Sequence, residues 1–139
     1  MGRIISIDYG RKRTGLAATD TLKLIANGLC TVKSSELIAF LKQYIEKEVV
    51  ELFIVGLPKQ MNNEPSESMK YITPFVVNLK RTFPQIPVEM VDERFTSALA
   101  HKAMIAGGLK KKDRQDKALV DEISAVIILQ TYMETQRFK

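Results

Sequence analysis

Short apolar and β-branched runs alternate with amphipathic stretches along this chain. Five runs have the length and composition of strands, at residues 4–8, 15–20, 28–33, 51–56 and 88–92. Apolar residues recur at helical spacing within residues 36–48, 71–79, 97–105 and 119–133. The pattern therefore predicts the order β-β-β-α-β-α-β-α-α, which is typical of an α/β fold.

The first two predicted helices carry local signals. Ser34 or Ser35 is expected to cap the first helix through its hydroxyl. Pro74 lies inside the pattern of the second helix and is expected to kink it or to shift its start. The apolar face of this second helix is expected to consist of Tyr71, Phe75, Val76 and Leu79.

The order of elements predicts a mixed five-stranded sheet, with three antiparallel strands followed by βα units and with helices flanking the sheet. A right-handed crossover would make residues 51–56 parallel to the first strand. Asp8, the turn at Gly56 and the pair Asp92-Glu93 would then lie at the carboxyl ends of strands, at one edge. Ligands of open α/β sheets usually bind at that edge.

Composition limits the class of protein. The 139 residues are expected to form one domain, residues 1–139, and the net charge of +5 suits a nucleic-acid partner, although a merely basic soluble protein would carry it too. The single cysteine, Cys30, fits a reducing cytoplasmic setting and a place in the core. No secretory signal is evident, and no apolar run approaches the roughly 20 residues that span a bilayer, so no membrane partner is expected.

Three carboxylates are candidates for a shared metal site. Asp8 ends a strand that looks buried, where a carboxylate needs a cation or a metal, although an aspartate can also simply terminate a basic hairpin. Asp92 and Glu93 are adjacent, so only one of them can face a site shared with Asp8. Asp121 lies one turn before Ala125 on the packing face of the last helix, where the helix dipole also favours an acid.

Cations close to these acids are candidates for phosphate binding. Arg13 lies in the turn bounded by Gly10 and Gly15, and Arg94 follows the second acidic pair. A basic stretch after Gly107-Gly108 is either a loop that grips a phosphate backbone or a solvated connector; its cations are Lys110, Lys111, Lys112, Arg114 and Lys117. P-loop, GxGxxG, HExxH and GxSxG motifs are missing, which argues against several large enzyme classes.

Taken together, these motifs resemble the YqgF (RuvX) family over residues 3–132. The matching segments are Asp8-Tyr9-Gly10 with Arg13 and Gly15, Gly56-Leu57-Pro58, residues 92–97, Lys117, and residues 120–130. The family is described as Holliday junction resolvases and as pre-16S rRNA nucleases with a ribonuclease H-like fold. The resemblance implies a cytoplasmic hydrolase in 5′-end maturation of ribosomal RNA, with Asp8, Glu93 and Asp121 as catalytic ligands of Mg²⁺ or Mn²⁺.

One departure concerns the fourth strand. The related RuvC resolvases keep an acidic residue at its end, whereas here it ends in Gly56-Leu57-Pro58 and the next acid is Glu64. RNA and branched DNA share the same phosphodiester chemistry, so precursor rRNA and Holliday junctions both stay open as substrates. A non-catalytic ribosome-assembly factor that binds nucleic acid is an alternative, as is a kinase-like relative. Both a monomer and a homodimer fit the sequence.

Overall fold

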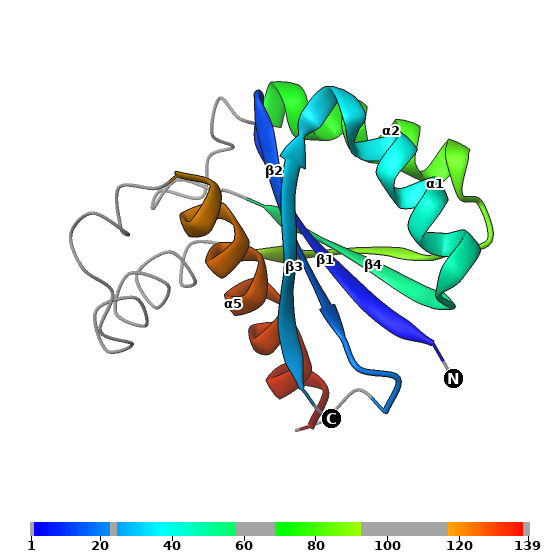
Figure 1. Cartoon of the computed structure of the whole chain (residues 1–139), viewed down its shortest axis with the longest axis vertical. Coiled ribbons are helices and arrows are strands. Elements are labelled where there is room, and N and C mark those ends of the chain that lie inside the picture. The colour runs from blue at the N-terminus through cyan, green and yellow to red at the C-terminus, as the bar shows by residue number, and fades with distance from the viewer. Residues whose placement is uncertain (1, 23–24, 58–68, 93–116, 138–139) are drawn as a thin grey trace.

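The computed structural model describes residues 2–22, 25–57, 69–92 and 117–137 (Figure 1). Its strands are β1 (Arg3–Tyr9), β2 (Arg13–Thr19), β3 (Ala26–Lys33), β4 (Val50–Leu57) and β5 (Val88–Asp92). Its helices are a 3₁₀ turn at Ser34–Glu36, α1 (Leu37–Lys47), α2 (Met69–Thr82) and α5 (Lys117–Arg137). All five predicted strands are confirmed, whereas the helix predicted at residues 97–105 lies outside the described residues.

The five strands form one mixed sheet in the order β3-β2-β1-β4-β5. The pairs β1–β2 and β2–β3 are antiparallel, while β4 is parallel to both β1 and β5. The expected topology is therefore confirmed. Because β1, β4 and β5 run in the same direction, their carboxyl ends meet at one edge of the sheet.

Helices cover both faces of the sheet, α1 and α2 on one side and α5 on the other (Figure 1). The core residues of each strand are divided between the two faces of the sheet, because successive side chains of a strand point to opposite faces. On β1, Ile5 and Ile7 join the cluster under α1 and α2, whereas Ile4 joins the cluster under α5. The neighbouring strand β4 divides in the same way, with Phe53 and Val55 on one face and Ile54 on the other.

The α5 helix packs through Ala125, Ile128 and Leu129, which are spaced three and four residues apart and are buried. Val126 packs at the margin of this contact and is half-buried. The cluster under α5 also includes the small buried side chain of Ala17 on β2. No helix in the described part of the chain is long and apolar enough to cross a membrane.

The expected buried face of helix α2 needs correction, and of the two effects expected of Pro74 the shift of the helix start is wrong. Tyr71 does not belong to the buried face, since 41% of its surface is exposed, and Ile72 takes that place beside Phe75 and Leu79. The reason is the phase of the helix, because Ile72, Phe75 and Leu79 are spaced three and four residues apart. Pro74 lies inside α2 and does not set its start, which comes five residues earlier at Met69.

The capping role expected for Ser34 or Ser35 is also wrong. The N-cap positions of the 3₁₀ turn and of α1 are Lys33 and Glu36, and neither makes a side-chain capping bond. The Ser34 hydroxyl instead donates to the Gly10 carbonyl oxygen and lies 2.9 Å from the Thr14 hydroxyl. Ser34 therefore anchors the turn between β1 and β2, a contact across the fold that local sequence cannot reveal.

Two cations also sit in different elements from those expected. Arg13 is the first residue of β2 and not part of the preceding turn, and Lys117 is the first residue of α5 and not part of a loop. In both cases the element begins two residues before the apolar pattern that predicted it. For Arg13 the reason is pairing across the sheet, since it lies opposite Lys33 of β3.

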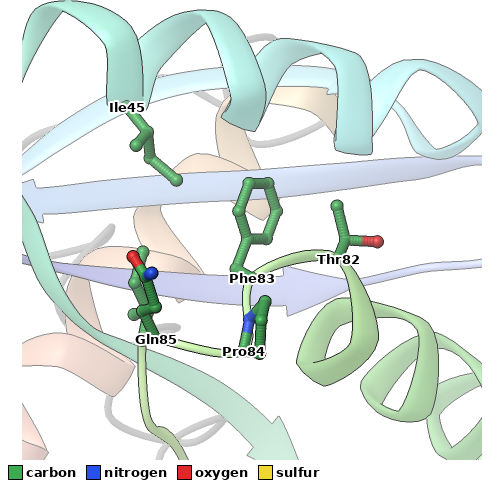
Figure 2. Close-up of a pocket in the computed structure, with 6 residues that line it drawn as sticks. Ile45, Thr82, Phe83, Pro84 and Gln85 are labelled. Atoms are coloured by element: carbon green, nitrogen blue, oxygen red, sulfur yellow. The ribbon is translucent and has the colours of Figure 1, made fainter.

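A pocket of about 300 Å³ lies between α1 and the connection from α2 to β5 (Figure 2). Its lining residues are Ile45, Thr82, Phe83, Pro84, Gln85 and Ile86. Ile45, Phe83 and Ile86 pack against the core under α1 and α2. The pocket thus belongs to the face of the sheet opposite α5.

Candidate functional site

Asp8 stands at the carboxyl end of β1, on the face that α5 covers. Ile4 packs under α5, and the buried Ser6 hydroxyl donates a hydrogen bond of 2.5 Å to the Ala125 carbonyl oxygen in that helix. Residues two apart on a strand share a face, so Ile4, Ser6 and Asp8 follow one another along the α5 side. The Asp8 residue is half-buried.

Glycines flank Asp8 on both neighbouring strands. Asp8 pairs directly with Gly15 on β2. On the other side, Ile7 pairs with Val55 of β4, so the next residues, Asp8 and Gly56, lie side by side. Gly56 in turn pairs with Val91 of β5. Neither neighbouring strand therefore places a side chain directly beside the Asp8 carboxylate, and both glycines are buried.

Helix α5 runs over this face in the direction opposite to β1, beginning on the side of the sheet where β3 ends (Figure 1). Ala125 contacts Ser6, and position 121 precedes Ala125 by one helical turn. Asp8 likewise follows Ser6 by two residues, towards the same edge of the sheet. The backbone thus brings position 121 towards Asp8, on the same side of the sheet.

The hydrogen bond between Ser6 and Ala125 anchors α5 to the central strand. We expect Ser6→Ala to lower the free energy of unfolding by about 1–3 kcal/mol, because the buried Ala125 carbonyl would lose a partner. Urea unfolding of both proteins measures this. Thr82→Ala removes a similar hydroxyl bond, to the Asn78 carbonyl, from an exposed site and should cost less. Equal stability of Ser6→Ala and the parent protein would contradict this role.

The C-terminal half of α5 is tied to the sheet by Tyr132. Burial and then a hydrogen bond with Glu89 raise the pKa of Tyr132 to about 12. At the other end of the helix, Glu122 lies against Gly28, where an added side chain would collide with its carboxylate. Contacts at both ends therefore fix the position of α5 on the sheet.

Arg13 is the described cation best placed next to Asp8. The pairing of Asp8 with Gly15 puts Arg13 diagonally across from Asp8 on the same face. The turn between them is held from the other side, since the Ser34 backbone N–H donates to the Lys12 carbonyl at 3.0 Å. Gly10 is required there, because a side chain would meet the Arg13 carbonyl oxygen at 2.5 Å.

Several predicted site residues fall outside this description. Glu93, Arg94, Lys110, Lys111, Lys112 and Arg114 lie outside the described residues. Asp121 and Lys117 are placed in the backbone of α5, but their side chains are not described. Within the described residues no three histidine, cysteine or acidic side chains form a metal-binding group. Of the three expected carboxylates, Asp8 is thus the one whose side chain the structure describes.

Asp8 has the chemistry that a divalent metal needs. Mg²⁺ and Mn²⁺ prefer carboxylate oxygens, and a half-buried carboxylate at a strand end is held in a narrow range of positions. The glycines at positions 15 and 56 add no side chain that would compete with a metal for this carboxylate. The described residues therefore fit such a metal.

Sequence reasoning missed the structural roles of Ser6 and Gly56. Ser6 interrupts an isoleucine-rich strand, and this polar residue in an apolar run was the available signal for a contact with another element. Gly56 was seen as a turn residue, although it is buried in β4 beside Asp8. Cys30 is half-buried as a small packing residue, and burial and then Glu122 raise its pKa, which makes it a poor nucleophile.

Comparison with known proteins identifies relatives along the whole chain. The family model described as "RuvX: Holliday junction resolvase" matches residues 2–135. A protein of Parabacteroides distasonis named "Putative pre-16S rRNA nuclease" is 68% identical over 139 residues, covering 100% of this chain and 99% of the relative. A protein of the same name from Bacteroides thetaiotaomicron is 68% identical over 138 residues, with coverage of 99% and 100%.

Among solved structures, Thermus thermophilus RuvC in complex with Holliday junction substrate matches with a TM-score of 0.58 and 18% identity. The match covers 97% of this chain and 96% of the RuvC chain. It confirms the ribonuclease H-like fold that the motifs implied. Because the family model spans nearly the whole chain and full-length relatives share two thirds of its residues, this chain belongs to the RuvX family of nucleases.

Proposed function

We propose that this protein is a metal-dependent nuclease that acts in the cytoplasm and hydrolyses phosphodiester bonds in the 5′ leader of precursor 16S rRNA. One observation carries the proposal: a half-buried carboxylate, Asp8, stands at the carboxyl end of the central strand between two glycines. Ligands of open α/β sheets bind at such an edge, and a phosphate can approach closest where side chains are missing.

We propose Asp8, Glu93 and Asp121 as the metal ligands. The backbone supports Asp121, because α5 brings its position towards Asp8 on the same face. Glu93 is proposed by its place in the family motif, directly after β5, a strand whose Val91 packs on the α5 side of the sheet. Gly56 lies between β1 and β5 at this level, so no β4 side chain would separate the ligands.

In this mechanism the protein supplies position and charge. Asp8 would hold the metal from a rigid strand, and Arg13 would hold a phosphate oxygen from the diagonal position on β2. The Ser34 contacts keep the intervening turn fixed, so that this cation and this carboxylate stay at a constant separation. When bound, Mg²⁺ or Mn²⁺ supplies an acidified water nucleophile and stabilises charge on the leaving oxygen.

We propose RNA as the natural substrate because the relatives that share two thirds of its residues carry a name that specifies pre-16S rRNA. The likeness to RuvC bears on the fold and not on the substrate. The deciding experiment compares cleavage of labelled precursor 16S rRNA, single-stranded RNA and four-way junction DNA, each with Mn²⁺ and with EDTA. Cleavage confined to junction DNA would contradict the RNA assignment, and no cleavage of any substrate would favour a non-catalytic assembly factor.

The basic stretch at residues 109–117 is expected to bind substrate without taking part in the chemistry. Replacing Lys110, Lys111, Lys112 and Arg114 with alanine should weaken binding of RNA and DNA alike. The slope of log affinity against log salt should fall by up to about 3, because fewer counterions are released. The cleavage rate at saturating substrate should fall much less than affinity. Anisotropy titrations over a salt series and single-turnover cleavage measure the two effects.

A matched control removes the same charge elsewhere. Lys42, Lys47, Lys80 and Arg81 are exposed on α1 and α2, and their replacement with alanine should leave most of the affinity in place. If both quadruple variants lose affinity equally, only net charge matters. If the variant of residues 110–114 keeps its affinity and its salt slope, the stretch is a solvated connector.

A further inference from the structure

An exposed aromatic side chain lies beside the basic turn that follows Asp8. Tyr71 is 41% exposed near the start of α2, and the Arg11 guanidinium carbon lies 5.3 Å from the centre of its ring. Figure 1 shows the start of α2 next to the hairpin of β1 and β2. Lys12 and Lys70, the neighbours of Arg11 and Tyr71 in the chain, are also exposed.

The position of this aromatic ring is fixed by packing one turn further along α2. The Tyr9 ring stacks on the Phe75 ring with centroids 4.2 Å apart and an angle of 9° between the planes. Tyr9 directly follows Asp8, and Phe75 lies one helical turn after Tyr71. Because the Tyr9–Phe75 stack is part of the core, it ties the start of α2 to the end of β1, where Asp8 lies.

Asp8 and Tyr71 lie on opposite sides of the same edge of the sheet. Asp8 belongs to the α5 face, while Tyr71 extends from α2 on the other face, and residues 10–12 form the turn between them. A nucleic acid strand that passes over this edge meets a carboxylate, then the cations of the turn, then an aromatic ring. That sequence of groups suits a single strand, because unpaired bases stack on aromatic rings while cations follow the phosphates.

We propose that Tyr71, together with Arg11, is a binding site for an unpaired nucleotide of the strand that runs past Asp8. The base stacks on the Tyr71 ring, and the Arg11 guanidinium binds the adjacent phosphate. The inference rests on the proposed function and deepens it, since it gives the enzyme a preference for substrates that are single-stranded next to the cleaved bond. In a continuous duplex the bases are stacked on one another and cannot reach the ring.

The test measures binding in EDTA, where no cleavage occurs, with a labelled single-stranded RNA and with the same RNA in a duplex. Tyr71→Ala should weaken single-strand binding roughly tenfold and leave duplex binding nearly unchanged. Tyr71→Phe keeps the ring and should bind like the parent protein. Arg11→Gln should lower the salt slope for the single strand by about 0.7, the value for one phosphate contact.

Val77→Ala is the matched control, because Val77 is an exposed side chain of the same helix, at 51%. The proposal is overturned if Tyr71→Ala binds the single strand as tightly as the parent protein, or if single-strand and duplex binding fall equally. Equal losses in Tyr71→Phe and Tyr71→Ala would also overturn it, since they would assign the effect to the hydroxyl. If the parent protein does not cleave rRNA, the proposed function is wrong. The comparison of single-strand and duplex binding by the Tyr71 variants still decides the nucleotide-binding site.

Discussion

Replacing Asp8 with asparagine should abolish metal-dependent cleavage while the protein stays folded. The change keeps the shape of the side chain but removes the charge that holds the metal. Loss of metal-assisted catalysis is worth several kcal/mol, so the cleavage rate should fall on the order of 10³-fold. In the absence of metal the melting temperature should stay the same or rise, because the change relieves repulsion among the carboxylates of the proposed metal site. Cleavage of precursor rRNA with Mn²⁺ and thermal melting in EDTA measure the two effects.

Asp20→Asn is the matched control for this experiment. The Asp20 carboxylate accepts a hydrogen bond from the Ile25 backbone N–H at 2.8 Å, in the hairpin between β2 and β3. That hairpin is at the opposite end of the strands from Asp8, so this variant should cleave at the rate of the parent protein. Full cleavage by Asp8→Asn would assign the activity to a contaminant or to another site.

Phe53→Ala should produce the largest loss of stability among single substitutions in the described core. Phe53 is fully buried in the interior strand β4, and the centre of its ring lies 5.5 Å from that of the Phe83 ring. Truncation leaves a cavity under α1 and α2, which costs about 3–5 kcal/mol. A domain of this size has about 5–15 kcal/mol in total, so a large share of the variant should unfold under mild denaturant.

Chemical unfolding measured by circular dichroism checks this prediction. Val49→Ala is the control, since Val49 is 69% exposed just before the same strand, and its truncation should change stability by no more than about 0.5 kcal/mol. Phe53→Ala, in the core, and Asp8→Asn, at the proposed site, should lose cleavage for different reasons. Phe53→Ala should lose cleavage only as far as it unfolds, whereas Asp8→Asn should lose cleavage while folded. Unchanged stability of Phe53→Ala would mean that the core repacks around the cavity.

The sheet and its topology could be predicted because they follow from local patterns. Strand runs, helical periodicity and the right-handed crossover together led to the correct parallel and antiparallel neighbours. The fifth strand was predicted with its observed bounds, Val88–Asp92. The choice of Asp8 also came from local sequence, since a carboxylate at the end of an apolar strand is visible without any structure. The fold and one site residue are thus properties of the sequence by itself.

Contacts between distant residues were decided by the tertiary structure alone. Register across the sheet brings Gly15 and Gly56 to either side of Asp8, and the docking of α5 puts the Ala125 carbonyl over Ser6. A hydroxyl at a helix start has several possible partners, and only the fold brings the Gly10 carbonyl within reach of Ser34. Local patterns report which face a residue occupies, whereas the neighbours on that face depend on how separate elements align. The sequence by itself therefore determined the sheet and the position of Asp8 at its carboxyl edge, and the tertiary structure decided what surrounds that residue.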